Sequence, residues 1–397
     1  MSISSQPRIL LRAGSDKRFK RGHPWVYSNE IRMDDEAKAI EPGTIVPLVR
    51  ADGKPAGVGT FNPHSLICYR GFTRSGAGAV DDEFIRERLS RAARLRDALY
   101  SEPHYRLVYG DSDGLPGLVI DRFGDVFVVQ TATAGMDMLL DDILRILDEL
   151  FQPRAIILSN SGAFRKLEKL ETYSKFAKGE LDGPIEVREN GLTFFADPMG
   201  GQKTGWFFDQ RANRAYMANL AKGRSVLDLY SYAGGFGITA AAGGASSVLC
   251  VDRAEGSLKL ANEAAKANNL DVIVKTQAGE VFATLEKFAE AKQRFGIVIA
   301  DPPAFVKTKK DVGPGAKGYR KMARLAAAVV EPGGFLFVAS CSHNMFEERF
   351  LDETAHGISQ AGRSGRVIYR GGAGPDHPIH PYLPESAYLK GLVYALD

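Results

Sequence analysis

The sequence predicts an α/β fold in which helices cover both faces of an open, mostly parallel sheet, preceded by a small β-barrel and a central α+β segment. Two observations lead to this prediction. From about residue 190 onward, apolar stretches of strand length alternate with longer stretches of helical periodicity, which is the pattern of a parallel sheet. Before residue 75, short strand-like stretches are separated by Gly and Pro turns, as in small barrels.

We expect three domains, at 1–74, 75–189 and 190–397. The first should contain strands at 44–49, 57–61 and 66–70. The second should contain a helix over 82–100, strands at 106–109, 118–121 and 126–130, a helix over 138–151 and a strand at 155–158. The third should alternate strands at 225–230, 247–252, 272–276, 296–301 and 335–340 with helices ending at 242 and over 257–269, 280–292 and 319–330. The middle domain shows no catalytic constellation, so we expect it to support the fold or to position a substrate.

The composition limits the class of protein. A chain of 397 residues, 44% of them hydrophobic, can build the cores of these domains, and no apolar stretch approaches the ~20 residues of a membrane-spanning helix. The polar, basic N-terminus lacks the apolar stretch of a signal peptide. Cys68, Cys250 and Cys341 lack the paired spacing of a disulfide framework or a zinc site. We therefore expect a cytoplasmic protein without a metal or a membrane partner, and the sequence leaves its oligomeric state open.

The most informative stretch is 226–237, where an apolar strand ends with an acid, a turn of small residues follows and an Ala-rich helix begins. Open α/β sheets present nucleotide-like cofactors in this way. The glycines do not keep the G-x-G-x-x-G spacing that seats a pyrophosphate at a helix N-terminus. S-adenosylmethionine has no phosphate and fits better: Asp228 would meet its cationic amino acid portion, while Gly234 and Gly235 would leave room for the nucleoside.

A second acid supports a cofactor at this place. Asp252 closes the next strand, 24 residues after Asp228, where ribose hydroxyls need an acceptor. The alternative is that both acids only cap the helices that follow, because Asp is a favoured N-cap residue. Asp301 and Cys341 also fall at strand ends, and ligands of such sheets bind beyond the carboxyl ends of the strands. We therefore expect these four side chains to lie on one rim of the sheet.

Asp301 precedes two prolines, which hold the backbone extended and fix the carboxylate that would bond the edge of a planar base. Two chemistries use such a clamp. In one, an exocyclic amine is methylated directly and an aromatic residue immediately after the prolines stacks on the base. In the other, a ring carbon is methylated after it has been made nucleophilic. Here Ala304 follows the prolines and the aromatic residue, Phe305, comes one position later.

Cys341 favours the second chemistry. The C5 atom of cytosine is a poor nucleophile until a thiolate adds to C6. Cys341 ends a strand among polar residues, whereas Cys250 lies inside an apolar strand, as a structural cysteine would. A free thiol has a pKa of about 8.5, so Cys341 needs an activating neighbour, and His343 is a weak candidate for it. The alternative, a structural role for Cys341, stays open, and no second cysteine accompanies Asp301.

Two basic segments predict contacts with RNA. The net charge of +3 is too small to prove such a partner, but residues 1–74 carry twelve Lys and Arg against seven acids. Cations alternate with aromatic residues over 17–25, and the candidate contacts there are Arg18, Lys20, Arg21, His23 and Trp25. We expect 307–321 to be a mobile loop that closes on phosphates through Lys307, Lys309 and Lys310. An ordinary solvated surface would explain either segment as well.

The chain resembles the RlmI-like cytosine-5 methyltransferases of large-subunit ribosomal RNA, which carry an N-terminal PUA domain. The resemblance rests on several motifs in one order: 21–28, 110–117, 121–124, 203–211, 231–236, 301–306, 340–342, 376–378 and 388–391. It implies a PUA RNA-binding domain at 1–74, a central α+β domain and a class I methyltransferase domain. It also implies that the cofactor is bordered by further residues, namely Phe207, Asp209, Gln210, Arg211, Tyr230 and Glu280; the family usually has Asp where Glu280 stands.

The sequence and the resemblance together give one hypothesis: S-adenosylmethionine-dependent methylation of C5 of a cytosine in 23S ribosomal RNA. Asp301 would hold the pairing edge of the flipped base and Cys341 would add to C6. The sequence does not identify the base that removes the C5 proton, the target nucleotide, or whether naked RNA or a ribosomal particle is modified. Two alternatives are an RNA methyltransferase acting on an exocyclic amine through Asp301 and Phe305, and a non-enzymatic RNA-binding assembly factor.

Overall fold

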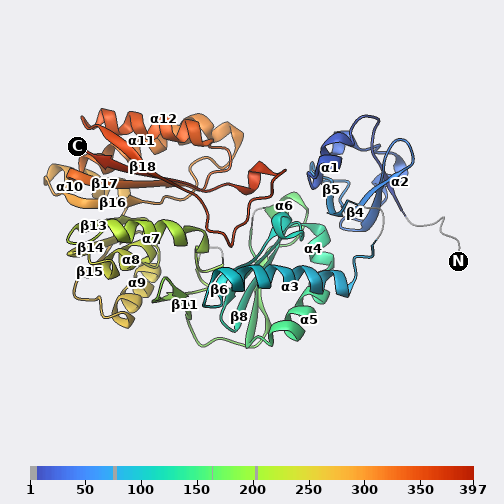
Figure 1. Ribbon diagram of the computed structural model, residues 1–397, viewed down its shortest axis with the longest axis horizontal. Coiled ribbons are helices and arrows are strands. Elements are labelled where there is room, and N and C mark those ends of the chain that lie inside the picture. The colour runs from blue at the N-terminus through green and yellow to red at the C-terminus, as the bar shows by residue number, and fades with distance from the viewer. Residues whose placement is uncertain (1–6, 75–77, 163, 202–203) are drawn as a thin grey trace. The chain divides into compact units, whose positions relative to one another are not determined.

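The computed structural model describes residues 7–74, 78–162, 164–201 and 204–397 (Figure 1). This described chain divides into two compact units, of which the first comprises the chain up to Ile185, Asp197–Trp206 and Pro375–Ser386, and the second comprises Glu186–Ala196, Phe207–Gly374 and Ala387–Asp397. None of the described helices is long and apolar enough to cross a membrane. Lys203, which belongs to the motif at 203–211, lies outside the described residues. The expected domain limits at 74 and 189 stay predictions.

The first unit begins with a small sheet. Its described strands run in the order β1 (Ile9–Leu10), β3 (Ile45–Val49), β4 (Pro55–Phe61), β5 (Tyr69–Thr73) and β2 (Trp25–Val26). The short helices α1 (Lys17–Arg21), η1 (Ser28–Glu30) and α2 (Asp35–Lys38) connect them. Phe19 of α1 is buried in the core of this sheet, and Gly71 makes room for it, because a Cβ on Gly71 would lie 2.7 Å from the Phe19 ring.

A second sheet follows in the same unit. Its described strands run in the order β10 (Tyr173–Lys178), β9 (Ala155–Asn160), β8 (Val126–Thr131), β7 (Leu118–Phe123) and β6 (His104–Tyr109). The accompanying helices are α3 (Asp82–Leu99), η2 (Gly110–Asp113), α4 (Ala134–Met138), α5 (Leu140–Phe151) and α6 (Phe164–Leu167). The helix expected over 138–151 corresponds to α5, and neither the short helix α4 before it nor β10 was expected.

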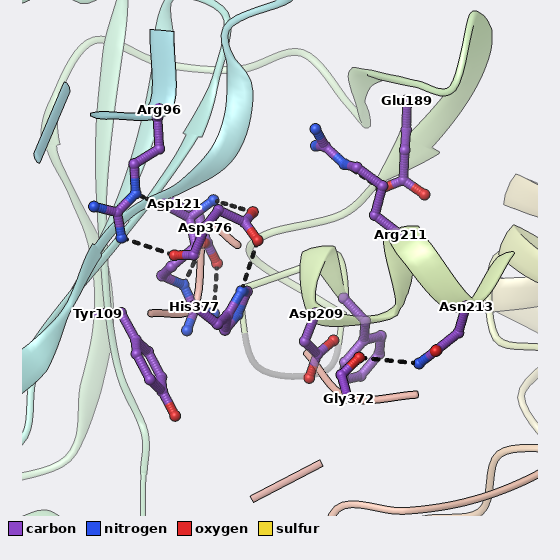
Figure 2. A network of polar contacts seen from close by, with 12 residues as sticks. Arg96, Tyr109, Asp121, Glu189, Asp209, Arg211, Asn213, Gly372, Asp376 and His377 are labelled. Atoms are coloured by element: carbon purple, nitrogen blue, oxygen red, sulfur yellow. Dashed lines mark hydrogen bonds and ion pairs between the residues drawn. The ribbon is translucent and has the colours of Figure 1, made fainter. Parts of the chain in front are cut away.

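The chain returns to the first unit near its end, and a buried arginine of α3 holds this returning segment. The Arg96 guanidinium is fully buried, pairs with both carboxylate oxygens of Asp113 at 2.7 and 2.8 Å, and donates to the Asp376 carbonyl at 2.7 Å. Figure 2 shows Arg96 aimed at Asp376, whose carboxylate also accepts from the Arg106 N–H at 3.1 Å. Ser386, in η5 (Pro384–Ser386), accepts from the Tyr109 hydroxyl at 2.8 Å. The segment 375–386 is thus fixed to the central sheet.

The second unit contains the predicted open sheet. Its described strands run in the order β15 (Val274–Ala278), β14 (Ser247–Asp252), β13 (Ser225–Leu229), β16 (Phe295–Ala300), β17 (Val330–Ser340), β19 (Lys390–Leu396) and β18 (Gly365–Gly371). The strands from β15 to β17 are parallel, and the two last are antiparallel additions that the sequence did not suggest. A hairpin of β11 (Ile185–Glu189) and β12 (Leu192–Ala196) lies outside this sheet.

Helices cover both faces of this sheet, as its apolar strands require. On one face pack α10 (Val281–Glu290), α11 (Val312–Ala328) and α12 (Glu347–Gln360); on the other pack α7 (Arg211–Leu220), α8 (Gly235–Ala242) and α9 (Glu255–Ala267) (Figure 1). Strand β16 shows the reason: Val298 and Ala300 join the first core cluster, while Ile297 and Ile299 join the second. Every residue of β16 is buried, so the strand is apolar throughout instead of alternating.

The expectation of a mobile loop at 307–321 is wrong. The structure has a short helix, η4 (Lys309–Asp311), followed directly by α11. Thr308 and Asp311 form a capping box, which starts the helical segment. Gly315 allows close packing and does not supply flexibility, because a Cβ there would lie 2.6 Å from the Phe305 carbonyl oxygen. Two of the glycines that suggested a loop, Gly315 and Gly318, are therefore contact positions of a packed helix.

Candidate active site

Asp228 lies at the carboxyl end of β13, buried beneath the turn that follows. Its Oδ2 accepts from the Gly237 N–H at 2.8 Å. Burial raises the pKa of Asp228 to about 7; the Gly237 N–H opposes this rise, and the negative charge of Asp301 adds to it. Near neutral pH the carboxyl is thus poised between its two protonation states, and a cation placed beside it would favour the ionised one.

The turn after β13 has an unusual backbone. Tyr230 and Tyr232 have φ values of 58° and 49°, in the left-handed region that side chains other than glycine rarely adopt. Gly234 follows with φ of 78°. The hydroxyl of Ser231 is buried and has no hydrogen-bond partner among the described residues. A strained turn that holds an unpaired buried hydroxyl fits a ligand with polar groups, as S-adenosylmethionine is.

Packing explains why glycine occupies positions 234 and 235, and the sequence did not show this. A Cβ on Gly234 would lie 2.9 Å from side-chain atoms of Ala261 and Ile238, and one on Gly235 would lie 2.6 Å from Arg214 Nε. Their small size therefore accommodates the packing of the protein itself. That they also leave room for a nucleoside stays a prediction.

Asp252 lies at the end of β14, the strand beside β13. Its Oδ2 accepts from the Tyr232 N–H at 3.0 Å and its Oδ1 from the Ala254 N–H at 2.9 Å, so it helps to hold the strained turn. The N-caps of α8 and α9 are Gly234 and Ala254, so neither acid occupies an N-cap position. Asp228 nevertheless bonds an N–H of the first turn of α8, which is part of what the capping alternative proposed.

Glu280 lies farther along the same edge of the sheet. It is the N-cap residue of α10, shortly after β15 ends, and its side chain is exposed.

The segment Phe207–Arg211 packs beside this turn. The edge of the Phe207 ring meets the Tyr232 ring, with centroids 5.3 Å apart. Asp209, in η3 (Phe208–Gln210), accepts from the Tyr388 hydroxyl, and Arg211 stacks on Phe208 at 5.4 Å. That this segment borders the cofactor stays a prediction.

The same segment is anchored through α7 by residues that the sequence analysis did not single out. The fully buried Glu189 carboxylate pairs with Arg214 at 2.5 Å and with Arg211 at 3.5 Å. Asn213 donates to Gln210 Oε1 at 2.6 Å and to the Gly372 carbonyl at 3.3 Å (Figure 2).

Asp301 and Cys341 end neighbouring strands, since β16 and β17 pair in parallel with Ala300 opposite Val338. Both residues are partly exposed. The loops that carry them are joined by a buried hydroxyl cluster: Tyr319 Oη lies 2.8 Å from Ser340 Oγ and 2.9 Å from Ser342 Oγ, and the latter accepts from the Val306 N–H at 3.2 Å. The sequence analysis did not identify Tyr319, because it placed this residue at the end of a loop.

Lys390 is a further residue that the sequence analysis did not identify. It starts β19, directly opposite Ser340 of β17, and its Nζ donates to the Ser342 carbonyl at 2.8 Å. Burial lowers the pKa of Lys390 to about 8, while the nearby Cys341 and Glu347 act in the opposite direction. A buried amine therefore lies beside the candidate nucleophile. His343, by comparison, is exposed, and its ring lies 5.3 Å from that of Tyr388.

The RNA-contact candidates of the first unit are mostly engaged within the protein. Arg18 pairs with Glu30 and Lys20 with Asp16, each at 2.6 Å. His23 is buried, and its Nδ1 lies 3.1 Å from the Trp25 backbone nitrogen; burial lowers its pKa, as does the charge of Arg18. Arg21 is exposed, and Trp25 donates from Nε1 to Asp111 at 2.8 Å. In the second unit, the candidates Lys307, Lys309 and Lys310 are exposed.

A parallel sheet with a glycine turn after its central strand, acids at successive strand ends and a cysteine on the same rim defines a class I methyltransferase. Comparison with known proteins agrees. A family model described as S-adenosylmethionine-dependent methyltransferase matches residues 117–393, and a PUA-like domain model matches residues 9–74. The predicted fold class is therefore confirmed, including its PUA-like N-terminal domain.

Relatives are similar over nearly their full length. Ribosomal RNA large subunit methyltransferase I of Shewanella denitrificans is 36% identical over 391 residues, which is 97% of this chain and 98% of that protein. The protein of that name from Klebsiella pneumoniae is 34% identical over 397 residues, 98% of each chain. This chain therefore belongs to the family of S-adenosylmethionine-dependent methyltransferases that contains those proteins, and S-adenosylmethionine is its cofactor.

Solved structures share the fold. A methyltransferase crystallised with SAH has a TM-score of 0.83, and a SAM-dependent methyltransferase from Streptococcus mutans has a TM-score of 0.81. Each is 21% identical and covers 98% of this chain and 99% of its own.

Proposed function

We propose that this protein transfers the methyl group of S-adenosylmethionine to C5 of a cytosine in large-subunit (23S) ribosomal RNA, with Cys341 as the nucleophile. The observation that carries the proposal is the placement of Asp301 and Cys341 at the ends of neighbouring parallel strands, with their loops joined through Tyr319 and Ser342. Relatives named for methylation of large-subunit ribosomal RNA, similar over 97% and 98% of this chain, supply the substrate class.

The steps follow from the residues on this rim. Asp301 accepts hydrogen bonds from the pairing edge of a base flipped out of the RNA. The Cys341 thiolate gives an electron pair to C6 and forms a C6–S bond, which makes C5 nucleophilic. When bound, the cofactor would supply the electrophilic methyl group that C5 takes up, with its methyl–sulfur bond broken and S-adenosylhomocysteine as the leaving group. A base then removes the C5 proton, the C5=C6 double bond forms again and the C6–S bond breaks.

Lys390 supplies the activating neighbour that the thiol requires. Its ammonium group, held against the Ser342 carbonyl one residue from Cys341, favours the thiolate by its charge. Because the pKa of Lys390 is lowered to about 8, the amine is also partly neutral near that pH and can take up a proton. Lys390 is thus our candidate for activating Cys341.

The cofactor is bound, in this proposal, along the edge formed by β13, β14 and β15. Asp228 faces its cationic amino acid portion, Asp252 accepts from the ribose, and Glu280 reaches the adenine. The remaining contacts come from residues around the turn: Phe207, Asp209, Gln210, Arg211, Tyr230, Gly234 and Gly235. The buried, unpartnered Ser231 hydroxyl, identified from the structure, joins them.

The RNA is held, in this proposal, by cations of both units. Arg21 and Trp25 of the PUA-like domain form one surface, and Lys307, Lys309 and Lys310 form another. Arg18 and Lys20, which pair with acids, and the buried His23 are left out of it. The three lysines precede the start of α11 and are exposed, so phosphates can reach them. Neutralising all three should flatten the salt dependence of RNA binding. An unchanged salt slope would show that the three lysines are not part of the RNA-binding surface.

The amine-directed alternative receives less support. It requires an aromatic ring that can stack on the base, and the partly buried Phe305 ring already packs on the Tyr319 ring, with centroids 4.7 Å apart, and against Gly318. The test is a methyl-transfer assay with ribosomal RNA from cells lacking this protein, followed by nucleoside mass spectrometry. 5-Methylcytidine is the expected product, and a methylated exocyclic amine would refute the proposal.

A further inference from the structure

A cavity of about 610 Å³ lies inside the first unit, whereas the strand ends that carry Cys341 belong to the second. The PUA-like sheet contributes one wall, helix α3 and the η2 turn contribute another, and the returning segment 375–386 contributes His380. The charged and polar lining residues are Thr73, Arg74, Arg88, Arg91, Asp111, Ser112 and His380. The volume is in the range of small-ligand sites.

The lining is basic. Three arginines stand against the single carboxylate of Asp111, among the described residues that line the cavity. Asp111 is itself engaged, since it accepts from Trp25 Nε1 at 2.8 Å and feels the positive charge of Arg70, which lies outside the lining. The cavity thus offers guanidinium groups in excess to an anionic guest.

Arg88 and Arg91 are held by weak contacts that leave some of their N–H groups available to a ligand. Arg88 stacks on Phe84 at 4.8 Å and donates to the Phe72 carbonyl at 3.4 Å, but its Nε is buried with no partner among the described residues. Arg91 makes one long contact, 3.5 Å to the Asp113 carbonyl. The Ser112 hydroxyl is also buried without a described partner. Buried donors of this kind are normally satisfied, so a ligand that accepts hydrogen bonds would complete the site.

The shape of the cavity depends on Gly22, which ends α1 in the left-handed region with φ of 118°. A Cβ on Gly22 would lie 2.9 Å from Arg74 Nη1 and 2.6 Å from the Tyr382 ring. Because Gly22 has no Cβ, the Arg74 side chain can reach the cavity. The apolar lining residues Phe19, Pro24 and Phe72 add flat and apolar surface beside the arginines.

We propose that this cavity binds a nucleotide of the RNA strand, with its phosphate held by Arg74, Arg88 and Arg91. The inference rests on the proposed RNA substrate but not on the chemistry at Cys341. It gives the central domain, through α3, a direct part in RNA binding. A phosphate is the group that three guanidiniums with spare donors recognise best, and the apolar and aromatic lining suits the sugar and base.

The test compares the affinity of two variants for protein-free large-subunit ribosomal RNA from cells lacking this protein. The double variant Arg74→Gln/Arg91→Gln removes two exposed arginines of the cavity. The control, Arg94→Gln, removes an exposed arginine that lies in α3, as Arg91 does, but does not line the cavity. Two lost phosphate contacts on single-stranded RNA should reduce the salt slope by about 1.4, which weakens binding about 25-fold at about 0.1 M salt. Arg94→Gln should bind as the wild type does.

Equal affinity and equal salt slope in the double variant and the wild type would overturn the proposal. Cytidine 5′-monophosphate serves as a second probe: binding of the mononucleotide that depends on Arg74 and Arg91, with RNA binding unaffected, would assign the cavity to a free nucleotide and overturn the assignment to RNA. The two proposals fail in different ways. If the proposed RNA substrate is wrong, the wild type itself lacks affinity for the RNA; if only the cavity is wrong, both proteins bind equally. Cofactor affinity, measured by calorimetry, should be the same in all variants.

Discussion

At the scale of single residues, Asp228 gives the clearest pH dependence. Because its pKa is raised to about 7, the carboxyl is largely protonated below that pH in the free protein. Pairing with the cationic amino acid portion of S-adenosylmethionine requires the ionised form. Cofactor affinity should therefore rise as the pH increases toward 7 and level off above it, falling by about tenfold for each pH unit below.

Calorimetric titration across this pH range measures the effect directly. Asp228→Asn removes the titrating group, so its weaker affinity should be flat over the same range. A wild-type affinity that does not change between pH 5 and 8 would show that Asp228 does not meet the cation.

Lys390 makes a second prediction at this scale. In Lys390→Gln the thiol loses its neighbouring cation, so the rising limb of the pH profile of kcat should move to higher pH, by about one unit or more. Lys390→Arg keeps the charge and should restore part of the rate at neutral pH. A loss of activity with the profile unmoved would indicate a structural role only, and cofactor affinity should be unchanged in both variants.

At the scale of elements, Tyr319 connects the loops after β16 and β17. Tyr319→Phe removes the hydroxyl that meets Ser340 and Ser342, and the loss of these buried hydrogen bonds should cost about 1–3 kcal/mol of unfolding free energy. We expect kcat to fall as well, because the loops that carry Asp301 and Cys341 lose their connection.

Tyr394→Phe is the matched control. Its hydroxyl is also buried and lies 2.7 Å from Thr354 Oγ1, outside the loop connection. Denaturant unfolding should show a comparable loss of stability, while kcat stays at the wild-type value. Equal kcat in Tyr319→Phe and Tyr394→Phe would contradict the role of the hydroxyl cluster.

Helix α11 offers a pair of glycines that separates packing from flexibility. A Cβ on Gly313 meets nothing within 4 Å, so Gly313→Ala should stabilise the helix by about 0.5–1 kcal/mol. A Cβ on Gly315 would lie 2.4 Å from Val306 and 2.6 Å from the Phe305 carbonyl, so Gly315→Ala should destabilise the protein. Thermal unfolding of the two variants measures both changes in stability. If both variants were stabilised, the close contact at Gly315 would not restrict the residue at that position.

The sequence predicts some elements well for a physical reason. Strands β13, β14 and β16 are buried on both faces, so they are apolar along their length, and the acids that follow or end them are easy to recognise. Helix α11 begins seven residues before the expected helix at 319, because its glycines, of which Gly315 and Gly318 serve close packing, resemble those of a loop. Local sequence does not separate these two uses of glycine.

At the scale of the whole molecule, what sequence reasoning could not provide is contact between distant segments. Lys390 lies opposite Ser340 only because β19 adds to the sheet antiparallel to β17, fifty positions later in the chain. The arginine-lined cavity likewise needs the segment 375–386 to return to the first unit, where Arg96 holds it. No local pattern signals either pairing, whereas Asp228, Asp252, Asp301 and Cys341 each follow a recognisable strand.

The predicted RNA contacts of the PUA-like domain illustrate the same limit. The alternation of cations and aromatic residues over 17–25 drew attention to this segment, yet Arg18 and Lys20 have acidic partners and His23 is buried. Charge partners depend on the fold, so composition overestimates the number of cations free to meet phosphate. The cavity arginines 74, 88 and 91 were not singled out, because they are spread over a strand end and a helix.

The central claim is that Cys341 is the nucleophile of a cytosine-5 methyl transfer. The most direct measurement is the transfer of labelled methyl groups from S-adenosylmethionine to ribosomal RNA from cells lacking this protein, with wild type and Cys341→Ala in parallel and nucleoside mass spectrometry of the product. We predict 5-methylcytidine with the wild type and none with Cys341→Ala, at equal cofactor affinity. Substantial 5-methylcytidine formation by Cys341→Ala, or methylation of an exocyclic amine by the wild type, would contradict the claim.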